Sequence, residues 1–158
     1  MPRLIKDNQV IDNEWQVIPA DFDAELPTGK LIVPLARWLD NSDNANLAPW
    51  LDSEDEVEKV AEQLVQAPLI AINFPTFMDG RGFSSARLLR ERYGYHGELR
   101  AIGNVIQDQL FYLKRCGFDA YDLREGTDLE AAMASLGDFS VSYQAATDTA
   151  EPLFRKRD

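Results

Sequence analysis

The chain has 158 residues, of which 45% are hydrophobic and 27% are charged, and its formal net charge is −11. This length and this composition are those of one ordinary globular domain. A single cysteine and a single histidine exclude an internal disulfide and the usual Cys/His ligand sets for zinc or iron–sulfur clusters within one chain. The acidic balance argues against general nucleic-acid binding, which needs a basic face.

Membrane insertion and secretion find no support in the sequence. No apolar run approaches the ~20 residues of a membrane span. The first ten residues, MPRLIKDNQV, lack the apolar stretch of a secretory signal. We therefore expect a cytoplasmic protein, and the sequence leaves its oligomeric state open, a homo-oligomer included.

The first third of the chain contains short elements. Residues 3–18 alternate short apolar runs with polar turn residues, which predicts an N-terminal β-hairpin within residues 1–20 with Asp7-Asn8 at its tip. LIVP at 31–34 predicts a buried strand, and LARWLD after it a short helix. LAPWLD at 47–52 predicts a further strand, weakened by Pro49.

Strands and helices alternate from about residue 47 onward. Apolar runs and helical periodicity predict strands at 68–74, 98–103, 118–123 and 139–144, and helices at 54–66, 84–94, 105–117 and 128–137. This order predicts a single α/β domain over residues 1–158 with a mainly parallel sheet, either open or curled into a partial barrel. The tail, residues 151–158, is expected to be loosely ordered.

The four predicted helix starts differ in their capping residues. Ser53, Asn104 and Thr127 are each followed three residues later by Glu or Gln, which is the pattern of a capping box. Ser84 is instead followed by Arg87. An arginine in the first turn of a helix forgoes a favourable dipole interaction that an acid there would gain, typically about 0.3–1 kcal/mol.

The segment around this fourth start has the residues of an anion site. Asp79, Gly80, Arg81 and Gly82 precede Ser84, and they follow a predicted strand at its carboxyl end, where ligands of parallel sheets bind. Helix N–H groups, two guanidinium groups and permissive glycines together suit phosphate, sulfate, sulfite or a carboxylate. An alternative stays open, in which Asp79 pairs with the arginines and the glycines only form a tight turn.

The charge distribution fits either interpretation. Residues 81–115 hold seven Lys or Arg against three acids, a net charge of +4, so the remainder of the chain carries −15. Such asymmetry can mark a local anion site. It is equally compatible with a basic segment that pairs with acidic segments in the fold.

Catalytic candidates are few. Asp79 could act as a general base, and Cys116, which follows Lys114 and Arg115, could be a reactive thiol or a small core residue. His96 lies in a predicted turn and reads as an exposed residue. The sequence contains neither a complete dinucleotide fingerprint nor a phosphate-binding loop, so no cofactor can be assigned.

The longest blocks of the chain resemble a bacterial family whose genes often stand beside those of sulfite reductase. The resemblance lies in LIKDNQVIDNEW near the start, LIVPLARWL at 31–39, the block from Asn73 to Leu123, FSVSYQAA at 139–146 and the PLFRKR tail. Within the central block the family motif falls on the following residues: Asp79, Gly80, Arg81, Gly82, Ser84, Arg87, Arg90, Arg92, Gly94, Gly97, Arg100, Asp108, Gln109, Arg115, Cys116 and Gly117. Phe83 stands where the family commonly has tyrosine.

The resemblance implies a role in sulfur assimilation, since the family is commonly labelled a probable oxidoreductase involved in sulfite reduction. Our first hypothesis is an accessory protein that binds a small oxyanion, or the phosphate of a larger ligand, at residues 79–87. A second hypothesis is a non-catalytic protein partner of the sulfite reductase machinery. An enzyme is the third, either the oxidoreductase of the family label or one that uses Asp79 as base.

Overall fold

A single eight-stranded sheet forms the framework of the protein. The structure, a computed structural model, describes residues 2–75 and 80–144, and side chains only as far as Leu136. The strands are β1 (Arg3–Lys6), β2 (Gln9–Asp12), β3 (Trp15–Val17), β4 (Lys30–Pro34), β5 (Leu47–Leu51), β6 (Leu69–Phe74), β7 (Glu98–Gly103) and β8 (Ala120–Tyr121). The helices are α1 (Leu35–Leu39), α2 (Val57–Leu64), α3 (Gly80–Arg87) with the π-helix η1 (Leu88–Arg92), the 3₁₀ turn η2 (Gln107–Gln109), α4 (Leu110–Arg115) and α5 (Leu129–Gln144).

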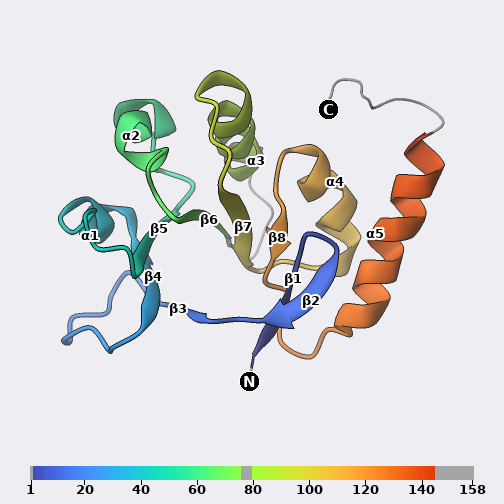
Figure 1. Ribbon diagram of the computed structural model, residues 1–158, viewed down its shortest axis with the longest axis horizontal. Helices are drawn as coiled ribbons and strands as arrows, with labels where there is room; N and C mark the ends of the chain where they lie inside the picture. Colours follow the sequence, from blue (N-terminus) through green and yellow to red (C-terminus); the bar gives the residue numbers. More distant parts are fainter. Residues whose placement is uncertain (1, 76–79, 145–158) are drawn as a thin grey trace.

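The sheet is mainly parallel and curls into a half-barrel (Figure 1). Its strand order is β2-β1-β8-β7-β6-β5-β4-β3, and β3 to β8 run parallel in chain order. The two antiparallel pairs are those that β1 forms, with β2 on one side and β8 on the other. The predicted α/β class and the mainly parallel sheet are therefore confirmed, in the partial-barrel form.

The helices pack on one face of the sheet. Because consecutive strands are neighbours and crossovers are right-handed, each helix returns on the same side. Side chains alternate accordingly along each strand. On β6, Ile70, Ile72 and Phe74 belong to the core cluster that contains the helix residues, while Leu69 and Ala71 belong to a second cluster without helix residues.

The second cluster fills the concave face of the half-barrel. Trp50 packs there with its ring N–H bonded to the carbonyl oxygen of Ile18 at 2.8 Å, and half-buried Trp15 lies against the same cluster. One end of this face holds a buried ion pair, in which Arg100 Nε lies 2.6 Å from Glu98 Oε2. Lys6 reaches Glu98 from β1 at 2.9 Å, so the charged pair ties the N-terminal hairpin to the parallel strands.

The hairpin of β1 and β2 has the predicted tip. Asp7 and Asn8 take φ angles of 52° and 65°, the left-handed values that a two-residue type I′ turn requires. The chain after β2 then crosses to the far edge of the sheet and forms β3 beside β4. The strand predicted around Pro49 is β5. Its ladder to β6 begins only at Trp50, so the missing N–H of Pro49 leaves no gap in the hydrogen bonds on that side.

Two sequence predictions of local structure are wrong. The strand predicted at 139–144 is the end of α5, because β1 already occupies the place beside β8 that a last strand would take.

None of the three predicted capping boxes starts a helix as proposed. The residues that precede α2 and η2 are Glu56 and Ile106, and α5 uses Asp128, whose carboxylate accepts the Ala131 N–H at 3.2 Å. The predicted loose tail, 151–158, lies outside the described residues.

Candidate functional site

The described part of the predicted anion segment, Gly80 to Arg87, forms helix α3, which follows β6 along the chain. Helix α3 begins at Gly80, four residues before the predicted start, and runs on into η1. Ser84 is therefore a mid-helix residue and Arg87 stands in the last turn of α3, so the predicted cap at Ser84 is wrong. Arg81 is the residue that stands in the first turn, which contains no acidic side chain.

Gly82 explains why the helix can start so early. A Cβ atom at this position would lie 2.6 Å from Cε1 of Phe74 and 3.3 Å from Cγ2 of Ile72. Glycine is disfavoured inside helices by roughly 1 kcal/mol, yet here it allows α3 to lie directly on β6. Close packing of α3 on β6 therefore requires a residue without a side chain at position 82.

One side of α3 faces an acidic groove. Arg81 and Ser84 are exposed on this side, and Arg81 Nη1 lies 3.5 Å from the carbonyl oxygen of Ser53 in the loop before α2. The groove is lined by Ser53, Glu54, Asp55, Glu56, Val57, Glu58, Arg81, Ser84, Ser85 and Leu88. Four carboxylates against one guanidinium make this groove a poor place for an anion.

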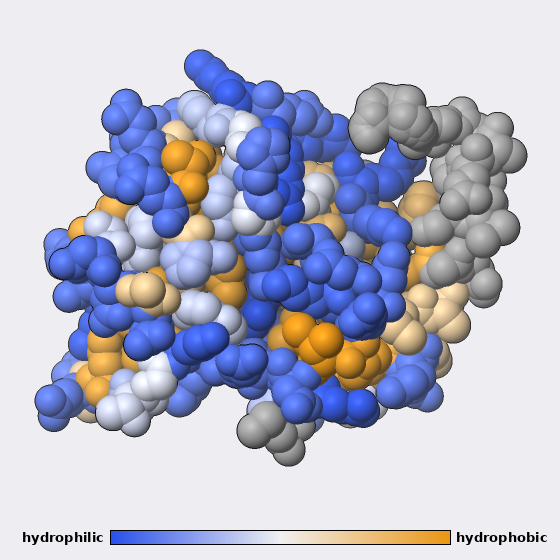
Figure 2. Space-filling view, in the orientation of Figure 1, coloured by the Kyte–Doolittle hydropathy of each residue, from blue (hydrophilic) through white to orange (hydrophobic). Residues whose placement is uncertain are grey.

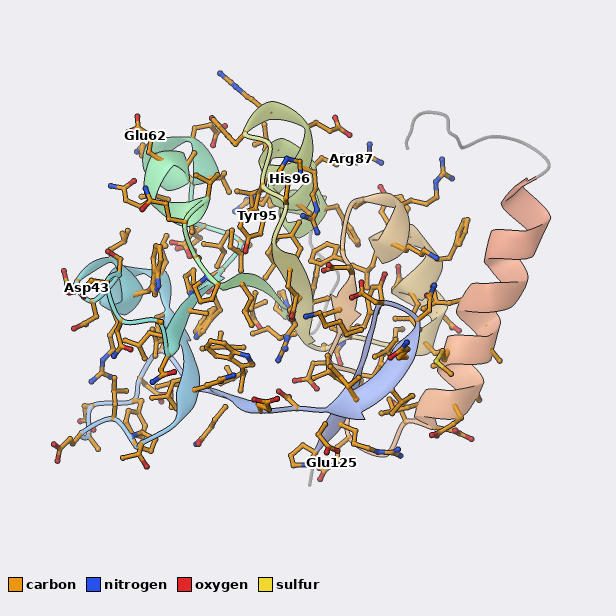
Figure 3. The ribbon with its side chains drawn as sticks, viewed as in Figure 1. Asp43, Glu62, Arg87, Tyr95, His96 and Glu125 are labelled. Atoms are coloured by element: carbon orange, nitrogen blue, oxygen red, sulfur yellow. The ribbon has the colours of Figure 1, made fainter. Side chains whose placement is uncertain are left out.

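Arg87 extends from the other side of α3, toward α4 (Figure 3). Burial alone would lower the pKa of Arg87, but contacts with the Cys116 thiol, Tyr112 and Glu91 outweigh it, so the pKa is raised. The structure therefore brings Arg81 and Ser84 to one groove and places Arg87 apart from both. Gly80 and Gly82 belong to the helix start with Arg81, and Asp79 lies outside the described residues.

The other two residues considered in the sequence analysis, Cys116 and His96, lie in the core and on the surface respectively. Cys116 is a free thiol, 2% exposed, within the core cluster on the helix side of the sheet. His96 is exposed, as predicted, in the turn before β7 (Figure 3). In the described part of the chain no three His, Cys, Asp or Glu side chains gather as metal ligands would. Nor does that part contain a helix with the length and apolarity needed to cross a bilayer.

Arg90 belongs to the family motif named above, but its structural role was not predicted from the sequence. Its guanidinium donates to the carbonyl oxygens of Tyr95, Gly97 and Gly117 at 2.8, 2.7 and 2.9 Å. It also lies 3.6 Å from the Asp119 carboxylate. One side chain thus joins the turn before β7 to the turn before β8, and no local pattern signals this because its partners are distant in sequence.

The buried Glu98–Arg100 pair was missed as well, although a signal existed. Residues two apart on a strand point to the same face. Opposite charges at this spacing inside the apolar segment ELRAIG therefore indicate an ion pair on one face of β7. Asp122, at the end of β8, interacts with the same Arg100, and burial raises its pKa although Arg100 lowers it.

The protein is therefore an α/β half-barrel in which helix α3 begins with glycines at the carboxyl edge of the parallel sheet. The chain belongs to a family of bacterial proteins of unknown function, DUF934, which matches residues 48–154. The matched region begins within β5 and includes the whole of α3 and α4. Neither a curated protein nor a solved structure matches the chain.

Proposed function

We propose that this protein is a cytoplasmic accessory protein of sulfite and sulfate assimilation that binds a small oxyanion, or the phosphate of a larger ligand, at the start of α3. The sulfur context comes from the resemblance to proteins encoded beside sulfite reductase. The observation that carries the binding site is Arg81 in an acid-free first turn at the carboxyl edge of a parallel sheet. Ligands of such sheets bind at this edge, and helix N-termini attract anions.

The geometry narrows the set of groups that would hold the anion. Among the described residues, the N–H groups without intrahelical partners at the start of α3 are those of Gly80, Arg81 and Gly82, rather than those around Ser84. Arg81 supplies the positive charge, and Arg87 points elsewhere. Since carboxylates line the groove toward α2, the anion would lie off the N-terminal end of α3, within reach of Arg81, rather than inside that groove.

Calorimetric titration of sulfite, sulfate and phosphate tests the site. Arg81→Ala should weaken binding about tenfold, since it removes one charge-assisted hydrogen bond. Arg87→Ala, which removes the same charge seven positions from the helix start, is the matched control and should bind like the wild type. No binding of any of the three anions by the wild type, or equal binding by all three proteins, would contradict the proposal.

A second candidate function is that of a non-catalytic protein partner. The observation that favours it is the exposure of Tyr112 on α4, next to Arg87. Exposed aromatic and arginine side chains are enriched at protein interfaces. This candidate does not require an oxyanion, and it concerns the opposite side of α3.

A further inference from the structure

Helix α2 and the end of the π-helix η1 border a second groove, separate from the one that contains Arg81. We name it the α2 groove; its volume is about 470 Å³, and it is lined by Glu58, Lys59, Ala61, Glu62, Gln63, Val65 and Tyr93. All seven residues lie in the described part of the chain, and none has a hydrogen bond, an ion pair or a ring contact with a residue outside it. Since Glu58, Glu62 and Val65 are exposed, the groove is open to a partner.

Glu58 and Glu62 give the groove an acidic wall. They lie four residues apart on α2. Within the described residues, neither carboxylate has a hydrogen bond or an ion pair. Like charges at this spacing repel each other and destabilise a helix slightly. A positive group bound between the two carboxylates would remove that repulsion.

The positive charges beside the groove are not paired with this wall. Lys59 Nζ lies 2.8 Å from the carboxylate of Glu56, which belongs to the groove on the other side of α2. The guanidinium of Arg92 lies 5.5 Å from the centroid of the Tyr93 ring, on the η1 side. Charge complementarity therefore selects a cationic group for the α2 side of the groove.

Apolar surface lies beside the two carboxylates. Val65 is 36% exposed, and Tyr93 is half-buried at the end of η1. Much of the surface in Figure 2 is hydrophilic, with small and separate apolar patches. An exposed valine and a tyrosine ring in one groove can bury an apolar side chain of a partner, which adds a hydrophobic contribution to the ion pairs.

The two sides of the groove are fixed relative to each other. The hydroxyl of Tyr95, two residues after Tyr93, donates to the carbonyl oxygen of Ala67 at 3.1 Å, just beyond the end of α2. Arg90 donates to the carbonyl oxygen of Tyr95 at 2.8 Å and so holds the same turn. A partner would therefore meet a groove that is already formed, which reduces the entropy lost on binding.

These features decide among possible occupants. A nucleic acid carries the same sign of charge as Glu58 and Glu62 and would be repelled by them. A metal ion would find too few ligands, because no three His, Cys, Asp or Glu side chains gather in the described part of the chain. Two carboxylates beside an apolar strip suit a peptide segment in which basic and apolar residues alternate.

We propose that the α2 groove docks such a segment of a partner protein, with Lys or Arg paired to Glu58 and Glu62 and an apolar side chain against Val65 and Tyr93. The proposal goes beyond the oxyanion site and uses none of its groups, since the groove is built from α2 and the end of η1. It also lies apart from Tyr112, because α3 stands between α2 and α4 (Figure 1).

The test uses fluorescence anisotropy with a labelled peptide of repeated Lys-Leu units, compared with Gln-Leu and Lys-Ser peptides. The wild type should bind the Lys-Leu peptide most tightly, and salt should weaken this binding. Glu58→Gln/Glu62→Gln should weaken it about fivefold, the effect of two exposed ion pairs. The matched control, Asp43→Asn/Glu125→Gln, removes the same charge from exposed positions that Figure 3 shows away from Glu62, and should have little effect.

Further variants separate the contributions. Val65→Thr should weaken binding, whereas Val17→Thr, at a valine of β3 that is also 36% exposed, should not. Urea unfolding should show Glu58→Gln/Glu62→Gln to be at least as stable as the wild type, because a repulsion is removed. A loss of peptide binding in that variant would then not be a loss of folding. Arg81→Ala should leave peptide binding unchanged, so this proposal and the oxyanion site can fail separately.

Four results would overturn the proposal. The first is equal binding of the three peptides by the wild type, and the second is an equal loss of Lys-Leu binding in the two double variants. The third is competition by single-stranded DNA for this site on the protein. The fourth is self-association of the wild type in sedimentation that Glu58→Gln/Glu62→Gln abolishes, since a second copy would then be the occupant.

Discussion

Replacing Gly82 by alanine would place a methyl group where side chains of β6 already lie. The added Cβ would be 2.6 Å from Cε1 and 3.0 Å from Cζ of Phe74. Carbon atoms prefer separations of about 3.5–4.0 Å, so this contact is strongly repulsive. Phe74 cannot easily turn away, because it is 1% exposed and the rings of Phe83 and Phe118 lie 5.1 and 5.8 Å from its centroid.

Two opposing terms determine the change in the free energy of unfolding. Alanine in a helix is favoured over glycine by about 0.5–1 kcal/mol. Overpacking a well-filled core typically costs about 1–3 kcal/mol. We therefore expect Gly82→Ala to destabilise the protein by about 1–2 kcal/mol, which lowers the Tm of a chain this long by about 3–6 °C.

Urea unfolding followed by tryptophan fluorescence measures this effect. Phe74→Leu removes the ring atoms that the new methyl group would meet, so it should partly rescue Gly82→Ala in a double-mutant cycle. Ser85→Ala, in the same helix and only partly buried, is a control for helix propensity. If Gly82→Ala were as stable as the wild type or more stable, helix–sheet packing would not require the glycine. Close approach of the backbone to a ligand would then be the better explanation for glycine at this position.

Two other substitutions test the interior of the fold. In Arg90→Lys, the lysine ammonium cannot reach the three carbonyl oxygens that the guanidinium bonds. This substitution should therefore lower the free energy of unfolding by about 3 kcal/mol in the same urea assay. An unchanged urea midpoint would contradict the structural role of Arg90. Burial raises the pKa of Asp122 above its ordinary value. The wild type should therefore gain stability relative to Asp122→Asn as the pH falls from 7 through that raised pKa. The stability difference between the two proteins should become constant below about pH 3.9, the pKa of an unfolded Asp. A difference between these two proteins that stays constant over this pH range would contradict the inference.

Most of the strands could be predicted because they are buried on both faces. PLIAINF contains β6, and ELRAIG is β7. The first is a continuous apolar run, and the second is apolar except for the Glu98–Arg100 ion pair; both have the length of a buried parallel strand. The tip of the first hairpin was also readable, because Asp7-Asn8 is a turn pair that accepts positive φ. The curl of the sheet was not readable from local patterns, and neither was the edge strand β3, which is only three residues long.

The wrong predictions share a physical cause. At α3 and at the end of α5, a local rule competed with long-range packing, and packing won. The glycines before Ser84 suggested a turn, but Gly82 is a helical residue fitted to Phe74. FSVSYQ has strand-forming residues, but the sheet has no free place beside β8, where β1 is already paired.

The candidate site changed for the same reason. Because α3 begins at Gly80, Arg81 and Arg87 lie six residues apart on one helix, and at about 100° per residue their side chains point in directions about 120° apart. One arginine therefore faces the acidic loop before α2 and the other faces α4. Helix α3 therefore directs the two guanidinium groups of the predicted anion segment to two different surfaces. An oxyanion assay that responds to Arg81→Ala and not to Arg87→Ala would establish that division, whereas equal loss of binding in both variants would mean that the two guanidinium groups act as one site.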